Sequence, residues 1–331
     1  MKKIIACTMA LVLLLSLLVT GCSKDNGLTA VTLCEVAHSL FYAPQYAAIE
    51  LGYFEEEGID LTLVNGGGAD KVMTSLISHD ADIGLMGSEA SIYVYTEGAM
   101  DYVVNFAQLT QRAGNFLVSR TPIENFQWSD LKGSTVLGGR KGGMPQMVFE
   151  YILKKHGLDP FTDLSMDQSI SFGLTAAAFT GGNADYTVEF EPYATLLEQE
   201  GSGYVVASLG EASGYVPYTA YSAQTSFLAS HPNVIQGFTN AIQKGLDFVN
   251  THSPQEIAAV IAPQFPETDE NTIAAIVARY QKQDTWKEDT LFEESSFSLL
   301  QNILSEAGEL PEKVPYDVLV TTEFSLAATQ K

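Results

Sequence analysis

The sequence predicts an α/β protein built from two units of ordinary domain size and a helical tail. Its 331 residues suit two domains, since a typical domain has about 100–200 residues. Hydrophobic residues make up 46% of the chain and aromatic residues 10%, which is typical of a globular protein. From Leu28 onward, strand-like and helix-like segments alternate. This repeated order favours parallel sheets with helices on both faces.

The first unit shows apolar, β-branched runs that indicate strands, and Pro, Ser and Gly residues that begin and end helices. Gly52 ends the first helix, and Ser88 is expected to cap the third. In chain order, the expected elements are a strand at 29–34, a helix at 44–51, a strand at 60–64, a helix at 70–78, a strand at 81–86, a helix at 88–97, and strands at 102–109 and 116–119.

The pattern restarts in a second unit and continues into a mostly helical tail. Gly157 ends an amphipathic helix that follows the glycine-rich loop 138–143. In the tail, Ser253 and Glu256 form a capping box, and Thr268 is expected to cap the next helix. In chain order, we expect a strand at 135–137, helices at 144–156 and 171–179, a strand at 186–190, a helix at 192–198, strands at 204–208 and 218–220, and tail helices that include 268–281 and 291–307.

Two architectures are open for these units, a simple tandem of domains or a pair of lobes between which the chain crosses twice. Short connections near residues 111–115 and 214–217 suit two hinge crossings, with the tail packing back on the first lobe. Periodicity alone does not decide between the two.

The N-terminus reads as a secretory signal. Two lysines follow Met1, and a largely apolar stretch covers residues 4–19. Gly21 before Cys22 resembles the lipobox of bacterial lipoproteins, in which the cysteine takes a diacylglycerol. The alternative is an ordinary signal with a coincidental cysteine. We expect a signal peptide at 1–21, lipidation at Cys22, a polar tether at 22–28, and a mature protein anchored outside the cytoplasmic membrane.

Charge and missing motifs exclude several classes of protein. The chain has 40 acidic residues against 17 basic ones, a formal net charge of -23, which argues against nucleic-acid binding. The nucleophile-elbow, zinc-protease, P-loop and dinucleotide-binding motifs are all missing from the sequence. The five histidines have no ligand-like spacing. We therefore expect neither a metal nor a cofactor, and no catalytic residues.

Several segments resemble one family in the same order. Residues 35–61, EVAHSLFYAPQYAAIELGYFEEEGIDL, are similar to the opening of type II substrate-binding proteins of ABC importers. These proteins serve sulfonates, nitrate and thiamine pyrimidine precursors. Further matching segments are GGGAD at 66–70, ADIG at 81–84, DLKG at 130–133, KHGLD at 155–159 and FEP at 190–192.

The resemblance implies two α/β lobes joined by two crossing strands, with one small molecule bound in the cleft. Closure of the lobes on the ligand would present a docking surface to a transmembrane permease. We expect the first lobe to comprise 29–114 and 216–331, the second to comprise 115–215, and the protein to act as a monomer. The ligand should lie at the carboxyl ends of strands and the starts of helices.

Four candidate ligand-binding residues follow the first strand: Glu35, His38, Phe41 and Tyr42. In relatives that bind aminopyrimidines, an Asp at the position of Glu35 and nearby aromatic residues hold the heterocycle. A carboxylate accepts from an exocyclic amine or a protonated ring nitrogen, and aromatic rings offer stacking faces. Alternatively, Phe41 and Tyr42 are core residues and Glu35 is a surface acid.

Gly87, Ser88 and Glu89 follow the third strand and begin a helix. Backbone N–H groups there could hold an anion, although Glu89 would oppose one. The alternative is a Ser N-cap followed by an acidic first turn.

The second lobe offers a glycine-rich loop and the end of a strand. Amides of the loop, including those of Gly142 and Met144, could reach a ligand. Arg140 and Lys141 are the best argument for an anionic ligand, unless they point to solvent or to the permease. On the strand side, the candidates are Tyr186, Glu189, Phe190 and Glu191, and Tyr218 and Tyr221 lie near the second crossing.

The candidate residues favour a flat, amine-bearing ligand, because four carboxylates and several aromatics outnumber two cations. We therefore predict the substrate-binding lipoprotein of an ABC importer, with a thiamine pyrimidine precursor as its ligand. One alternative is a binding protein for aliphatic sulfonates, taurine or nitrate. Others are an exported enzyme that pairs Glu35 with Glu189 across the cleft, and a sensor lipoprotein that presents its ligand to a membrane receptor.

Overall fold

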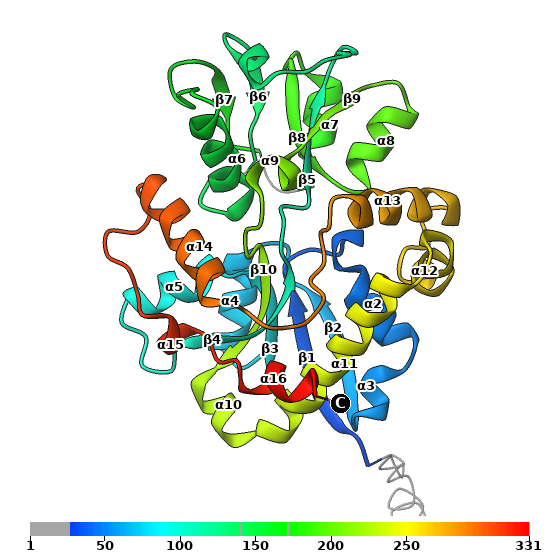
Figure 1. Cartoon of the computed structure of the whole chain (residues 1–331), viewed down its shortest axis with the longest axis vertical. Helices are drawn as coiled ribbons and strands as arrows, with labels where there is room; N and C mark the ends of the chain where they lie inside the picture. The colour runs from blue at the N-terminus through cyan, green and yellow to red at the C-terminus, as the bar shows by residue number, and fades with distance from the viewer. Residues whose placement is uncertain (1–26, 140, 171–172, 331) are drawn as a thin grey trace, which may run out of the picture.

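A computed structural model describes residues 27–139, 141–170 and 173–330, and it contains two five-stranded sheets (Figure 1). The expected signal peptide, Cys22, most of the tether and Arg140 lie outside these residues. The first sheet has the order β2-β1-β3-β10-β4 and the second the order β7-β6-β8-β5-β9. Their strands are β1 Thr29–Glu35, β2 Ile59–Asn65, β3 Ile83–Gly87, β4 Val103–Thr110 and β10 Thr219–Gln224 in the first, and β5 Asn115–Ser119, β6 Thr135–Leu137, β7 Ser165–Asp167, β8 Tyr186–Phe190 and β9 Tyr204–Ser208 in the second.

Both sheets are mixed, so the prediction of parallel sheets is wrong for part of each. The β1–β2, β1–β3, β6–β7 and β6–β8 pairs are parallel, as the strand–helix alternation predicts. However, β10 is antiparallel to β3 and β4, and β5 is antiparallel to β8 and β9. Each of these two strands enters its sheet from the other lobe, so no helical crossover connection sets its direction.

The chain crosses between the sheets twice, at neighbouring positions. The first crossing leads from β4 into β5, and the second returns from β9 to β10. The backbone N–H of Val216 donates to the carbonyl of Gln111 at 2.9 Å, and that of Tyr218 donates to Thr110 at 3.3 Å. This topology excludes a simple tandem and confirms the two-lobed α/β fold. The exact lobe boundaries at residues 115 and 215 stay a prediction.

Helices cover the sheets and extend into the tail, close to the predicted ranges. The capping box of Ser253 and Glu256 is present. By contrast, Asp269 and not Thr268 caps the following helix, accepting from the N–H groups of Asn271 and Thr272. The helices are α2 Ala43–Glu50, α3 Tyr53–Glu56, α4 Ala69–Ile77, α5 Glu89–Thr96, α6 Met144–Lys155, α7 Thr175–Gly181, α8 Tyr193–Gln199, α9 Leu209–Ser213, α10 Thr225–Ser230, α11 Pro232–Thr251, α12 Pro254–Ile261, α13 Glu270–Lys282, α14 Glu294–Glu306, α15 Tyr316–Leu319 and α16 Glu323–Ala328, with 3₁₀ turns η1 Leu40–Tyr42, η2 Trp128–Leu131 and η3 Ala262–Gln264.

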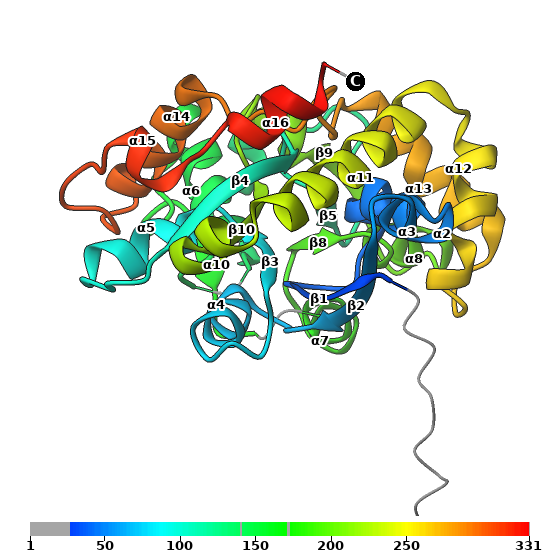
Figure 2. The same ribbon diagram turned by 90° about the horizontal axis from the view of Figure 1, so that it is seen from below.

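The long helix α11 packs the tail against the first lobe. It contacts α2, α3 and α16 and buries Ile235, Phe238 and Leu246 (Figure 2). The approach to α2 is close enough to require a glycine, because a Cβ at Gly245 would lie 2.2 Å from the carbonyl oxygen of Pro44. Within the residues described, no helix combines the length and the apolar character needed to span a bilayer.

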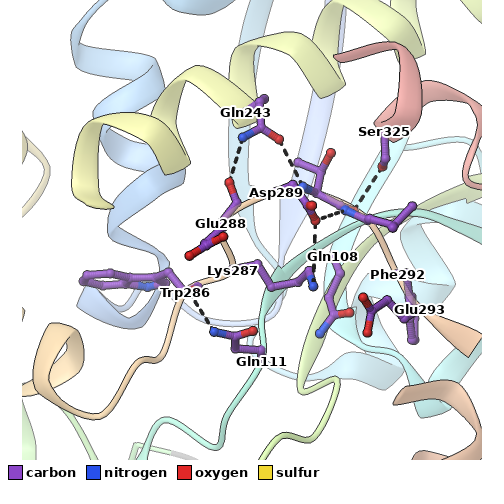
Figure 3. Close-up of polar contacts among 12 residues, drawn as sticks. Gln108, Gln111, Gln243, Trp286, Lys287, Glu288, Asp289, Phe292, Glu293 and Ser325 are labelled. Carbon is purple, nitrogen blue, oxygen red and sulfur yellow. Dashed lines mark hydrogen bonds and ion pairs between the residues drawn. The ribbon is translucent and has the colours of Figure 1, made fainter. Parts of the chain in front are cut away.

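The segment between α13 and α14 covers the edge of the first sheet (Figure 3). The backbone N–H of Gln108 on β4 donates to the carbonyl of Thr290 at 2.8 Å. The backbone N–H of Lys287 donates to the carbonyl of Leu109 at 3.3 Å. Gln243 of α11 holds the segment from above, since its side chain donates to the carbonyl of Glu288. The unpaired edge of β4 is therefore protected from pairing with another chain. Trp286 in the same segment donates its indole N–H to Phe41 at the cleft.

Candidate ligand-binding site

A cavity of about 160 Å³ lies between the two lobes. The first lobe contributes the turn after β1, the start of α4 and the β3–α5 junction. The second contributes the glycine-rich loop before α6 and the end of β8. The larger side chains of the lining include the aromatic residues, one methionine and one buried acid: Phe41, Tyr42, Phe190, Tyr218, Met144 and Glu89.

Aromatic rings form much of the cavity wall. The ring of Phe41 lies 5.2 Å from Tyr42, 5.9 Å from Phe190 and 5.7 Å from Tyr218, the last pair at an interplanar angle of 86°. Edge-to-face contacts of this kind are stabilising and hold the rings in place. Phe41 and Tyr42 are therefore both buried packing residues and part of the cavity lining, so the two interpretations of these residues are not exclusive.

Glu89 is the buried acid of this cavity. Its side chain is only 2% exposed and lies directly over Gly87, where an added Cβ would be 2.1 Å from Oε2. Burial raises the pKa of Glu89 to about 7, while hydrogen bonds from the backbone N–H groups of Glu89 and Met144 oppose the rise. Oε2 of Glu89 and the hydroxyl of Tyr218 are buried without a hydrogen-bond partner among the described residues. Both residues line the cavity, so its wall contains two unsatisfied polar atoms.

Glu35 lies outside the lining of this cavity. Its Oε2 accepts from Gln45 and from the hydroxyl of Tyr46, each at 2.8 Å, and its Oε1 lies 2.8 Å from Nδ1 of His38. The hydrogen bond with Glu35 raises the pKa of His38, and burial opposes this rise. The structure therefore gives Glu35 internal partners from α2 and the β1–η1 turn, which a local sequence pattern does not reveal.

A second cavity of about 180 Å³ shares Phe190 with the first. Glu189 and Glu191 both line it, although β8 ends at Phe190 and the predicted alternation does not extend to Glu191. Glu189 accepts from the hydroxyls of Thr175 and Thr187, and burial raises its pKa to about 7. His38 lies in this second lining too, but Glu35 belongs to neither lining, so the Glu35 and Glu189 pair of the enzyme hypothesis does not face one shared cavity.

The remaining predicted residues divide between the cavity and other places. Gly87, Gly142, Met144 and the exposed Lys141 line the first cavity. Ser88 does not: its backbone is helical and its hydroxyl donates to Pro217 at 2.7 Å, so the prediction of a Ser cap is wrong.

Tyr186 also lies away from both linings. It begins β8, which ends at Phe190, and four residues of strand span about 13 Å. Its ring packs near Phe126 instead.

The sequence analysis did not identify Arg279, which forms ion pairs beside the second cavity. Arg279 on α13 donates to Glu191 at 2.7 Å and to Glu198 at 2.6 Å. No local sequence pattern reveals these ion pairs, because both partners of Arg279 lie more than 80 residues away in the sequence. No group of three His, Cys, Asp or Glu side chains in the described residues is arranged to hold a metal ion.

Comparison with known proteins identifies the family. The model of the NMT1/THI5-like family matches residues 41–257. YtlA of Bacillus subtilis (strain 168), whose name describes it as a candidate binding protein, is 46% identical over 326 residues, covering 98% of this chain and 97% of YtlA.

Solved structures share the fold at low identity. The ligand-binding component of an ABC-type import system from Staphylococcus aureus, solved with zinc bound, has a TM-score of 0.75 and 14% identity, and 92% of this chain and 100% of that chain are covered. The alkanesulfonate-binding protein SsuA from Xanthomonas axonopodis pv. citri, bound to MOPS, has a TM-score of 0.71 and 16% identity over 88% and 98% of the two chains. The nitrate-binding protein NrtA from Synechocystis PCC 6803 has a TM-score of 0.70 and 15% identity over 92% and 89%. The chain therefore belongs to the NMT1/THI5-like family and has the two-lobed fold of type II periplasmic binding proteins.

Proposed function

We propose that this protein is the substrate-binding component of an ABC importer, and that it captures a single-ring, amine-bearing molecule between its lobes. Family membership and the likeness to YtlA support a binding role. The likeness in fold to an import-system component supports the transport role. We further propose that lipidation at Cys22 anchors the protein outside the cytoplasmic membrane, where it delivers ligand to a permease as a monomer.

The observation that carries the ligand class is the pair of unsatisfied polar atoms in an aromatic cavity. Oε2 of Glu89 can accept from an exocyclic amine or a protonated ring nitrogen, and the Tyr218 hydroxyl can donate or accept. The rings of Phe41 and Phe190 offer apolar surface to a flat heterocycle. A thiamine pyrimidine precursor, such as a hydroxymethyl or formylaminomethyl aminopyrimidine, has these features.

The size of the cavity favours one ring. Cavities of about 150 Å³ hold benzene, so 160 Å³ accommodates one six-membered ring but not two. Thiamine and riboflavin would need the second cavity as well. Phe190 belongs to both linings, as do Ser39 and Pro145.

Thermal shifts of the protein from Ser23 onward test this function directly. The panel comprises aminopyrimidines, thiamine, riboflavin, taurine, alkanesulfonates and nitrate. An aminopyrimidine at a thousandfold excess over its dissociation constant should stabilise the fold by about 4 kcal/mol. A shift with sulfonates or nitrate alone would contradict the ligand class and favour the alternative anion site.

That alternative rests on Lys141 and the loop amides before α6, which also line the cavity. Lys141 is exposed, so solvent screens its charge, whereas Glu89 acts from a buried position. We also propose binding without turnover. Chemical change of any panel compound during incubation with purified protein would contradict that part.

A further inference from the structure

Helix α6 begins at the cavity with its amino-terminal end. Its first residue, Met144, follows the glycine-rich loop and is almost completely buried. The free N–H groups at the start of a helix, together with the helix dipole, favour a negative group. A helix start aimed into a cleft would therefore suit an anionic ligand if nothing else occupied the position.

In this protein, the position is occupied by a side chain of the opposite lobe. The carboxylate of Glu89, at the start of α5, accepts a hydrogen bond from the backbone N–H of Met144. It reaches this place because Gly87 has no side chain to block it. One oxygen, Oε2, is left buried and without a partner among the residues described, and Glu89 lines the same cavity as Tyr218, whose hydroxyl is also unpartnered.

We propose that Glu89 is the specificity-determining residue of the cleft and, in its ionised form, acts as a built-in anion at the start of α6. It takes the position that a sulfonate, nitrate or phosphate group would need, and it repels such groups from a buried site where screening is weak. Its free Oε2 then selects ligands that bring an N–H donor or a positive charge. The inference deepens the proposed function and rests on it for the identity of the natural ligand.

The charges around the cavity agree with this assignment. Lys141 is the one cation in the described part of the lining, and it is exposed. Among the described lining residues, an incoming anion would therefore meet a buried negative group and one positive group that solvent screens.

The test uses two substitutions of Glu89 and one matched control. Glu89→Gln removes the charge while keeping the size of the side chain, and Glu89→Ala removes both. Glu97→Gln makes the same charge change at the exposed C-terminal end of α5, away from the cavity. The probes are methanesulfonate and nitrate, with 4-amino-2-methylpyrimidine as the donor-bearing probe. Affinities are measured by calorimetry at pH 8, where Glu89 is ionised, on the protein from Ser23 onward.

We expect the Glu89→Ala variant to bind methanesulfonate at least tenfold tighter than the parent protein, and the Glu89→Gln variant to show a smaller gain. The Glu97→Gln variant should behave like the parent. If both Glu89 variants keep their circular dichroism and cooperative melting but bind neither anion better, the inference is overturned. An equal gain in the Glu97→Gln variant would also overturn it, because net charge would then explain the effect.

The outcome separates this inference from the proposed function. Binding of the aminopyrimidine to the parent protein tests the proposed ligand class alone. Gain of anion binding in the Glu89 variants tests the role of Glu89 alone, since it requires no natural ligand. Anion gain without aminopyrimidine binding would support the inference and reject the proposed ligand, and the reverse result would do the opposite.

Discussion

Arg279 on α13 and Glu191, which directly follows β8, form an ion pair of 2.7 Å that joins the C-terminal tail to the second lobe. The same guanidinium reaches Glu198 on α8 at 2.6 Å. Helix α13 packs against η1 of the first lobe, so this double ion pair links the two sides of the cleft. Glu191 is fully buried and follows Phe190, which lines both cavities.

Replacing Arg279 by Ala should destabilise the protein and loosen the contact between the two sides of the cleft. It leaves the buried Glu191 without its charged partner, which we expect to lower the free energy of unfolding by about 2–3 kcal/mol. Urea unfolding measures this loss, and small-angle scattering should show a larger radius of gyration without ligand. Lys282→Ala, which removes an exposed cation from the same helix, is the control. Equal effects of the two substitutions would argue against the link.

The raised pKa of Glu89 makes stability depend on pH. The pKa of Glu89 is about 7 in the folded protein, whereas the ordinary pKa of a glutamate is 4.5, so between these values the folded protein retains a proton that the unfolded chain releases. This contribution is fully present below about pH 4.5 and is lost as the pH rises through 7, by about 3 kcal/mol in all. Urea unfolding of the parent and the Glu89→Gln variant between pH 5 and pH 8 checks it. As the pH rises, the free energy of unfolding of the parent should fall relative to that of the variant. An equal pH dependence of the two proteins would be inconsistent with a buried, titrating Glu89.

Replacing Phe190 by Ala should join the two cavities. The cavities have volumes of about 160 and 180 Å³ and share this residue, so the variant should accept two-ring molecules such as thiamine. Thermal shifts with thiamine and with an aminopyrimidine compare the two sizes of ligand. Phe161→Ala removes the same side chain from a position that is 70% exposed, and it should not respond to thiamine. A parent protein that already binds thiamine would refute the one-ring limit.

Replacing Glu35 by Ala should affect stability more than ligand binding. The substitution strips hydrogen bonds from the buried Gln45 amide and the Tyr46 hydroxyl, at an expected loss of about 2–3 kcal/mol. The pKa of His38 should fall as well, because the bond with Glu35 is what raises it, and an NMR titration would show this. The Glu89→Gln variant should show the opposite pattern, with weaker aminopyrimidine binding and no loss of stability at pH 8. Strong loss of ligand binding in a Glu35→Ala variant that still folds would contradict this prediction and indicate that Glu35 binds the ligand.

Local patterns were enough to predict most of the helices and strands. The apolar run of β1, the glycine that ends α6 and the capping box of α12 each involve residues close in sequence. Their conformations depend on propensities and hydrogen bonds that span only a few residues, so the sequence shows them directly. The order of several short segments was also enough to indicate the family.

Tertiary structure decided the direction of β5 and β10 and the identity of the acid in the cavity. Glu35 is the last residue of β1 and Glu89 comes soon after β3, and sequence reasoning favoured Glu35. Only the folded chain shows that Glu35 is satisfied by Gln45 and Tyr46, whereas Glu89 meets Met144 from the other lobe and keeps a free oxygen. The physical reason is that a buried carboxylate is available to a ligand when its protein partners leave an oxygen unsatisfied, and those partners are brought together by the fold.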